Sequence, residues 1–217
     1  MLKLGDKSIS KLYLGDKAIS KAYLGEKLVF QGIKFVDYIS FDGESWVDVE
    51  YIPSSNTRVV GKVSFTQWHP TAGANYVFGV YGGGANFGFN VGSNRGTMNV
   101  PWGTTSGISL SNNTTFGQVY SFDISKNGAY LDDVLKIEAS KFTQEFTATK
   151  PFFVGWANGT SVQKLVGNIY PIQIYENDVL VKDLRPYVDE NGVACLYDIV
   201  TKKCFYNQGD GELGYSE

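Results

Sequence analysis

The segment GNIYPIQIYENDVLVKDLRPYVDENGVACLYDIVTKKCFYNQGDGELGY, residues 167–215, decides the fold of this chain. It contains the runs NIYPIQIYEN, VACLYDIV and KCFYN, in which apolar and polar residues alternate. Such alternation is typical of a β-strand with one buried and one solvated face. The Glu176-Asn177-Asp178 stretch predicts the tip of a hairpin. We therefore expect antiparallel strands joined by tight turns.

The same pattern extends upstream. Runs spaced by about ten residues include YISFDG, WVDVEYI, RVVGKVSFTQW, YVFGVYG, NFGFNVG, QVYSFDIS, AYLDDVLKIEA and PFFVGWA, and Gly, Asn, Asp or Ser stands in nearly every gap. Asn127-Gly128 predicts another hairpin tip. Many short strands with frequent turns predict an all-β fold, an antiparallel two-sheet sandwich or jelly roll.

Composition narrows the classes of function. The 217 residues are 43% hydrophobic and 19% charged, which suits one sizeable β domain and a small additional module. A net charge of −3 gives no general attraction for nucleic acid. The sequence has no apolar run of about 18 residues, and its start lacks the apolar stretch of a signal peptide. We expect synthesis in the cytoplasm and no membrane insertion.

Residues 2–30 form a repeat with a ten-residue period, in which LGDK at 4–7 recurs at 14–17 and as LGEK at 24–27. Each unit predicts short strands around a turn, with one shared apolar face. So short a module cannot bury that face alone. Its partner is either the following domain or neighbouring chains, and we favour self-assembly. We therefore divide the chain into an assembly module, 1–32, and a sandwich domain, 33–217. The assembly residues are Leu4, Ile9, Leu14, Ile19, Leu24 and Leu28.

Two stretches resemble a known family. ESWVDVEYIPSSNTRVVGKVSF, residues 44–65, resembles the QYIDTGYTPNSNTRVE pattern that opens the concanavalin-A-like, laminin-G-like modules of phage and prophage tail and fibre proteins. Residues 167–215 are similar to the ending of that family, a strand with IYxxxLVRDLxP followed by GxxxLYDxVxxxFYxNxGxGxF. The resemblance covers about residues 40 to 215.

The resemblance implies a phage virion structural protein: a fibre, tail or capsid-decoration subunit that displays one jelly roll. It also implies a homotrimer, contact with other virion proteins and a location on the virion. It implies no ligand, because the fold serves many functions and the function must be argued from a site. Two alternatives stay open, a receptor lectin for host-surface polysaccharide and a glycoside hydrolase.

The hydrolase alternative rests on Asp48 and Glu50, which in an extended strand would lie on one face about 7 Å apart. Trp46 stands where hydrolases of this fold carry their first carboxylate, and a retaining mechanism needs two carboxylates about 5 Å apart. His69 is the single histidine, and no nucleophile motif accompanies it. We therefore expect a protein that is not an enzyme.

Carbohydrate recognition needs exposed aromatic faces beside hydrogen-bonding side chains. Trp68 and Trp102 stand next to turn signals, where we expect exposure, whereas Phe87 and Phe89 share one face of a strand that we expect to be packed inward. The candidate glycan-binding residues are Trp68, His69, Trp102, Trp156 and Asn158.

No cofactor is predicted. Calcium is the one metal considered, because Asp123, Asp132, Asp133 and Asn158 offer oxygen ligands, but their spacing is not diagnostic. Cys195 and Cys204 could meet across a hairpin, yet cytoplasmic synthesis favours reduced thiols.

Overall fold

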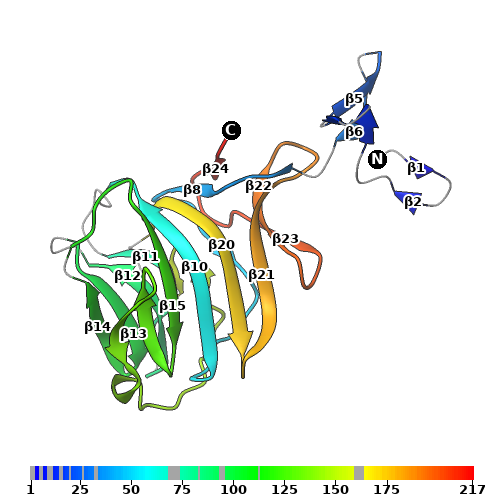
Figure 1. Ribbon diagram of the computed structural model, residues 1–217. Coiled ribbons are helices and arrows are strands. Elements are labelled where there is room, and N and C mark those ends of the chain that lie inside the picture. Colours follow the sequence, from blue (N-terminus) through cyan, green and yellow to red (C-terminus); the bar gives the residue numbers. More distant parts are fainter. Residues whose placement is uncertain are drawn as a thin grey trace.

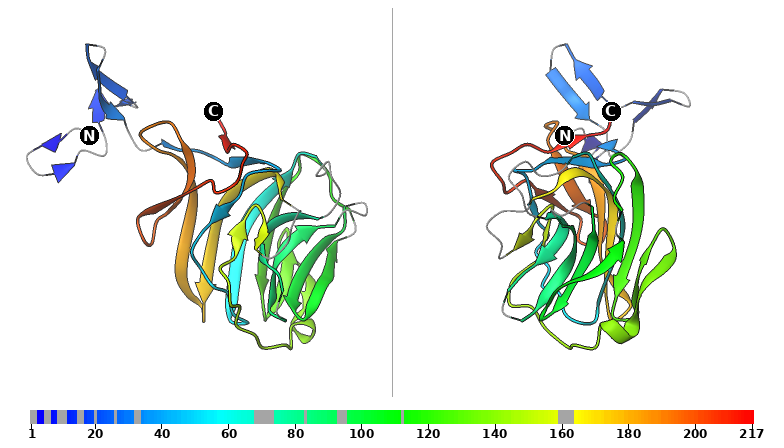
Figure 2. Two further views of the ribbon diagram at one scale, coloured as in Figure 1. Left: turned by 180° about the vertical axis from the view of Figure 1, so that it is seen from behind. Right: turned by 90° about the vertical axis from the view of Figure 1, so that its left-hand side faces the viewer.

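The computed structural model shows an all-β protein in which two sheets pack face to face (Figure 1). It describes the chain apart from residues 1–2, 5–6, 9–11, 15–16, 20, 26, 32–33, 68–73, 83, 93–95, 112 and 159–163. The right-hand view of Figure 2 looks along the edge of the sandwich and separates its two layers. The predicted fold class, an antiparallel two-sheet sandwich of the jelly-roll type, is confirmed.

The larger sheet is built mainly from the second half of the chain. Its path is β17 (Val134–Glu138), β16 (Gly128–Leu131), β15 (Val119–Ser125), β10 (Thr57–Phe65), β20 (Val166–Glu176), β21 (Val179–Val188), β22 (Ala194–Asp198) and β23 (Lys203–Tyr206). β8 (Ile39–Asp42) pairs with the first half of β20 and with β24 (Gly214–Tyr215), and β7 (Lys34–Phe35) pairs with β21.

The smaller sheet forms the other layer. Its path is β14 (Thr105–Ser111), β13 (Met98–Gly103), β12 (Asn86–Val91), β11 (Asn75–Val80), β18 (Phe153–Val154) and β9 (Val47–Asp48). β19 (Ala157–Asn158) runs parallel to β11, and the short 3-10 helix η1 (Ala139–Lys141) follows β17. Within the described residues, no helix is long and apolar enough to cross a membrane.

The hairpin tips follow turn chemistry. Asn177 and Asp178, between β20 and β21, have φ angles of 51° and 62°, as a type I′ turn requires, so this predicted tip is confirmed. The second predicted hairpin is present, but Gly128 already pairs with Ser125, so its tip is Lys126-Asn127, one residue before the predicted Asn127-Gly128. Asp132 and Asp133 form a further turn with φ angles of 50° and 61°. The run AYLDDVLKIEA is therefore two strands, β16 and β17, and not one.

The core lies between the sheets and is rich in aromatic rings. Phe87 and Phe89 are fully buried, which confirms their predicted inward direction. The Phe78 ring centroid lies 5.9 Å from that of Phe87 and 5.8 Å from that of Phe122. Gly61 makes this packing possible, because a Cβ there would lie 2.8 Å from Cζ of Phe122.

The β13–β14 hairpin was not predicted, and it overturns one expectation. Trp102 is only 1% exposed, and its Nε1 donates a 3.0 Å hydrogen bond to the carbonyl of Gln144. The expectation that Trp102 is exposed is therefore wrong. The Pro and Gly that flank it suggested a loop, but Trp102 is the penultimate residue of β13, and the turn begins only at Gly103, whose φ is 57°.

The N-terminal repeat forms three separate hairpins. These are β1 (Lys3–Leu4) with β2 (Lys7–Ser8), β3 (Leu12–Leu14) with β4 (Lys17–Ile19), and β5 (Lys21–Leu24) with β6 (Lys27–Gln31). Figures 1 and 2 place these hairpins beyond one end of the sandwich. The short strands expected of this repeat are therefore present. The predicted domain boundary falls at residues 32–33, outside the described residues.

Of the repeat residues expected to share one apolar face, the structure describes the side chains of Leu14 and Leu24, which are 76% and 75% exposed. Ile9 and the side chains of Leu4, Ile19 and Leu28 lie outside the described residues.

Candidate functional site

A groove of about 970 Å³ lies on the outer face of the larger sheet. Strand alternation builds its floor. Along β10, Val59 and Val63 are fully buried between the sheets, whereas Arg58, Val60 and Lys62 point outward and line the groove. The volume is at the upper end of the range of about 300–1,000 Å³ that is typical of ligand clefts.

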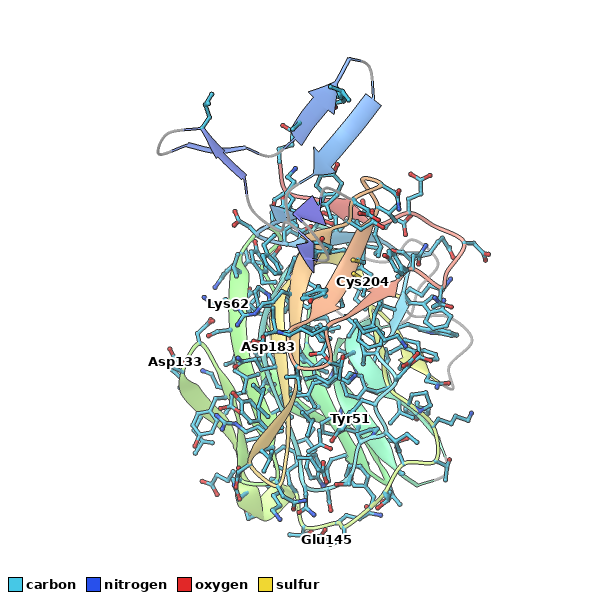
Figure 3. The ribbon with its side chains drawn as sticks, turned by 90° about the vertical axis from the view of Figure 1, so that its right-hand side faces the viewer. Tyr51, Lys62, Asp133, Glu145, Asp183 and Cys204 are labelled. Carbon is cyan, nitrogen blue, oxygen red and sulfur yellow. The ribbon has the colours of Figure 1, made fainter. Side chains whose placement is uncertain are left out.

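The groove has aromatic and acidic sides. Tyr130 and Asp133, from the β16–β17 hairpin, line one side, and Asp37 and Tyr170 line another part of it. Figure 3 shows Asp133 on the projecting hairpin and Lys62 on the same side of the molecule. The Tyr170 ring is held at 5.5 Å, between centroids, by the ring of Tyr38. The groove therefore offers tyrosine rings beside hydrogen-bonding groups.

A bulge in β20 shapes the centre of the groove. Gly61 of β10 pairs with Ile172, but Val63 pairs with Ile169, so Tyr170 and Pro171 of β20 stand opposite the single residue Lys62, and β20 carries one extra residue at this point. Proline cannot donate a ladder hydrogen bond, and within a sheet it belongs at an edge or a bulge. Bulges redirect side chains. Tyr170 and Pro171 both line the groove as a result.

Paired charges cover much of the floor. Arg58 donates from Nε to Oδ1 of Asp123 at 2.8 Å and from a terminal nitrogen to Oδ2 at 2.6 Å. The hydrogen bonds and negative charge of Asp123 raise the pKa of Arg58. Two of the five N–H donors of a guanidinium are used in this fork. Among the described residues, the other three N–H donors of Arg58 form no hydrogen bond with a side chain.

A second arginine–aspartate pair lies on β21. A terminal nitrogen of Arg185 donates a 2.9 Å hydrogen bond to Oδ2 of Asp183. Nε of Arg185 lies 2.7 Å from Oδ1, which is buried and has no hydrogen-bond partner among the described residues. Gln173, between the two pairs, accepts a 2.9 Å hydrogen bond from the Tyr175 hydroxyl, which fixes its amide. Lys62 forms no ion pair within the described part of the chain. The groove is thus rich in rigid donors and acceptors with little net charge.

The predicted glycan-binding residues do not gather at this groove. Trp68 and His69 lie outside the described residues, and Trp102 is buried in the core. Asn158 belongs to β19 of the smaller sheet, and Trp156 lies in the bend that connects β18 to β19. Asn158 donates a 2.8 Å hydrogen bond to the carbonyl of Pro151, which is a structural contact within the chain.

Trp156 lies in a half-buried aromatic cluster. Its ring centroid is 5.2 Å from that of Trp46 and 5.6 Å from that of Phe153, and the Lys164 ammonium lies 5.9 Å from it. Among the described residues, Trp46, Phe153 and Trp156 line neither the groove nor two further hollows of the molecule.

The residues considered for catalysis do not form a catalytic pair. β9 ends at Asp48, and Glu50 has a left-handed φ of 53°, so the two residues do not alternate along an extended strand. Oδ1 of Asp48 accepts a 2.7 Å hydrogen bond from the backbone of Glu50. The Glu50 carboxylate lies 2.5 Å from the Lys203 ammonium. Both side chains have structural partners.

The four oxygen ligands considered for calcium do not come together. Asp123 is held by Arg58, and Oδ1 of Asp132 accepts a 2.9 Å hydrogen bond from the Ser121 backbone. Asn158 lies in the other sheet. Within the described residues, no group of three or more His, Cys, Asp or Glu side chains is arranged to hold a metal.

A second polar hollow, of about 650 Å³, lies at the end of the sandwich away from the N-terminal hairpins, where Figure 3 labels Tyr51 and Glu145. Its centre is the Glu176 carboxylate, which accepts hydrogen bonds from Tyr51, Ser54 and Thr57 at 2.6, 2.6 and 2.9 Å. Burial opposes ionisation of Glu176, but these hydrogen bonds outweigh it and lower the pKa. The network pins the PSSNTR segment to β20.

The cysteines stay free. Cys195 is buried on β22 and Cys204 is half-buried on β23, at diagonal positions of the ladder. Burial, together with the neighbouring Cys204, raises the pKa of the Cys195 thiol.

Comparison with known proteins shows the fold. No family model matches the chain, and no curated protein does. A proposed carbohydrate-binding protein from Bacteroides ovatus is similar in structure, with a TM-score of 0.60 and 10% identity over 93% of this chain and 67% of that one.

Trypanosoma rangeli sialidase is a slighter match. In complex with 2,3-difluorosialic acid it gives a TM-score of 0.48 and 12% identity, over 71% of this chain and 29% of that one. A complex with the inhibitor DANA gives a TM-score of 0.47, 14% identity and coverages of 71% and 28%. Likeness at this level says nothing about the activity of this chain.

Proposed function

We propose that this protein binds carbohydrate in the groove on the outer face of the larger sheet. The observation that carries the proposal is the combination in one groove of two tyrosine rings, Tyr130 and Tyr170, with the Arg58–Asp123 fork and the paired guanidinium of Arg185. Aromatic faces pack against the C–H surfaces of sugars. The similarity of fold to a proposed carbohydrate-binding protein supports the same function.

This arrangement suits hydroxyl groups in particular. A sugar hydroxyl both donates and accepts hydrogen bonds. The Arg58–Asp123 fork presents N–H donors next to carboxylate acceptors, and Arg185 adds N–H donors held in place by Asp183. Because each arginine is already paired, the floor carries little net charge to attract an ionic ligand. Asp123, the carboxylate on the β15 part of the floor, is engaged by Arg58. We propose that binding occurs without chemical turnover.

A glycan array followed by calorimetry with the saccharides that bind tests this proposal. We expect Tyr170→Ala to weaken binding about tenfold or more, which corresponds to about 1.4 kcal/mol. Trp156→Ala is the matched control, since it removes a half-exposed aromatic ring from the bend between two strands of the smaller sheet. Binding that survives Tyr170→Ala but is lost in Trp156→Ala would move the site to the other sheet. An array without any bound saccharide would refute the function.

The second candidate function is structural. We propose that the hairpins of residues 1–32 assemble copies of the chain, most simply as the homotrimer of a phage fibre or tail, with the sandwich displayed outward. The supporting observation is the exposure of Leu14 and Leu24 on two-stranded hairpins, which are at best marginally stable alone. Light scattering on a sizing column gives the mass of the full chain and of a chain that starts at Ile33. A trimer that becomes a monomer on truncation supports assembly, and two monomers contradict it.

A further inference from the structure

An apolar hollow of about 440 Å³, distinct from the polar hollow around Glu176, adjoins the groove on the outer face of the larger sheet. Phe35, Pro186 and Ile199 line it, and Val36, Pro171 and Arg185 line both the hollow and the groove. The three shared residues show that the two spaces are adjacent. The hollow is more apolar than the groove, because a phenylalanine, a valine, an isoleucine and two prolines surround it.

An aromatic platform stands at this hollow. β7 pairs with β21, and Phe35 lies opposite Tyr187 in the register. The Phe35 ring centroid is 5.5 Å from that of Tyr187 and 6.1 Å from that of Tyr197, and those two rings are 5.4 Å apart. Phe35 is nevertheless 49% exposed. The Phe35 ring is therefore held in place by contacts with two tyrosine rings, and about half of the residue remains exposed to solvent.

The charges along the two spaces define the ligand class. Arg58 and Arg185 are each neutralised by an aspartate. Of the other charged groups, Lys62 lines the groove together with Asp37 and Asp133. A single ammonium beside two carboxylates offers no attraction for a polyanion. Neutral hydroxyl groups, in contrast, can form hydrogen bonds with the arginine–aspartate pairs.

We propose that the ligand is a neutral, linear oligosaccharide or polysaccharide that runs from the groove into the hollow, with Phe35 as a stacking subsite for a distant sugar unit. This inference rests on the proposed carbohydrate-binding function and extends it. Arg185 stands at the junction and bonds hydroxyls of units on both sides. The groove and the hollow together bind several sugar units of one polysaccharide, whereas a short saccharide occupies only the groove.

Affinity as a function of chain length tests the inference. The full protein is titrated with cello-, laminari- and malto-oligosaccharides from the disaccharide upwards, and with oligogalacturonates as the acidic counterpart. We expect affinity for the neutral series that binds to rise with length and then level off. Phe35→Ala should remove about a tenfold gain for long chains and leave short chains unchanged, whereas Phe35→Tyr should keep the gain.

Phe116→Ala is the control, because this phenylalanine is 44% exposed and lines neither space. Thermal melts show whether each variant is folded. Affinity that does not depend on length, or an equal loss for short and long chains in Phe35→Ala, overturns the inference while groove binding stands. Tighter binding of oligogalacturonate overturns the neutral class. Failure of every saccharide to bind refutes the carbohydrate function itself.

Discussion

The two faces of the larger sheet use the same strands for opposite purposes. On β10, Val59 and Val63 are fully buried in the core, whereas Arg58 and Lys62, one residue along, line the groove. The inner face is constrained by packing against the other sheet, so almost any apolar side chain of suitable size would serve there. No such constraint acts on the outer face. Its tyrosines and arginine–aspartate pairs therefore indicate which ligand the protein binds.

Removing an inner-face ring should have the largest effect on stability. Phe122 is 2% exposed, and its ring lies 5.2 Å from Phe89 and 5.8 Å from Phe78, between centroids. We expect Phe122→Ala to lower the free energy of unfolding by about 3–5 kcal/mol, because a large cavity is left. Urea denaturation measures this. Tyr130→Ala on the outer face is the contrast, and an equal loss there would erase the distinction between the faces.

The inner face also holds one buried ion pair, and it makes stability depend on pH. Asp198 is fully buried, with its Oδ2 3.4 Å from the Lys182 ammonium. Burial would raise the pKa of Asp198, but hydrogen bonds from Thr201 and from two backbone N–H groups, with the Lys182 charge, outweigh it and lower the pKa. The stability from this carboxylate is present above its unfolded pKa of about 3.9 and is lost as the pH falls through the folded value.

Asp198→Asn should therefore cost about 3 kcal/mol at neutral pH, because Lys182 keeps a buried charge without its partner. Unfolding curves from neutral to acidic pH should show the gap between wild type and variant narrowing below about pH 4. A gap that stays constant with pH would show that Asp198 acts only through packing. Lys203→Ala is the control, since its partner Glu50 is exposed.

We expect a smaller effect on stability from the hydrogen bonds of Tyr51, Ser54 and Thr57 to the Glu176 carboxylate, at the end of the sandwich. Tyr51 donates to the Glu176 carboxylate at 2.6 Å, and burial with this hydrogen bond raises the pKa of Tyr51. Tyr51→Phe removes a hydrogen bond to a charged group and should cost about 1.5 kcal/mol. Saccharide affinity should not change, because the network does not line the groove. A matching loss of affinity would link the two regions and contradict their separation.

Local sequence patterns predicted the inner face far better than the outer one. Alternation in NFGFNVG indicated that Phe87 and Phe89 are buried, since period-2 patterning is itself the packing signal. The β13–β14 hairpin was missed because Pro101 and Gly103 imitate a loop. The groove was missed because Arg58, Asp123, Tyr170 and Arg185 are far apart in the chain and meet only through strand order and register. One signal was available, the proline within NIYPIQIYE, which marks the bulge at Tyr170.

Substitution of Lys62 should have the smallest effect on stability. It should affect binding alone, which distinguishes the outer face of the sheet from the inner face. Lys62 is exposed on the groove floor and forms no ion pair within the described part of the chain. Lys62→Ala should change the free energy of unfolding by less than about 0.5 kcal/mol. It should weaken saccharide binding a few-fold, by the loss of one hydrogen-bond donor worth about 0.5–1.5 kcal/mol. Lys136→Ala, an exposed lysine of β17 that does not line the groove, should change neither quantity. Packing against the other sheet does not constrain side chains on the outer face. A residue of a ligand site there should therefore affect binding without affecting stability. If Lys62→Ala and Lys136→Ala had the same effect on binding, Lys62 would not belong to the site.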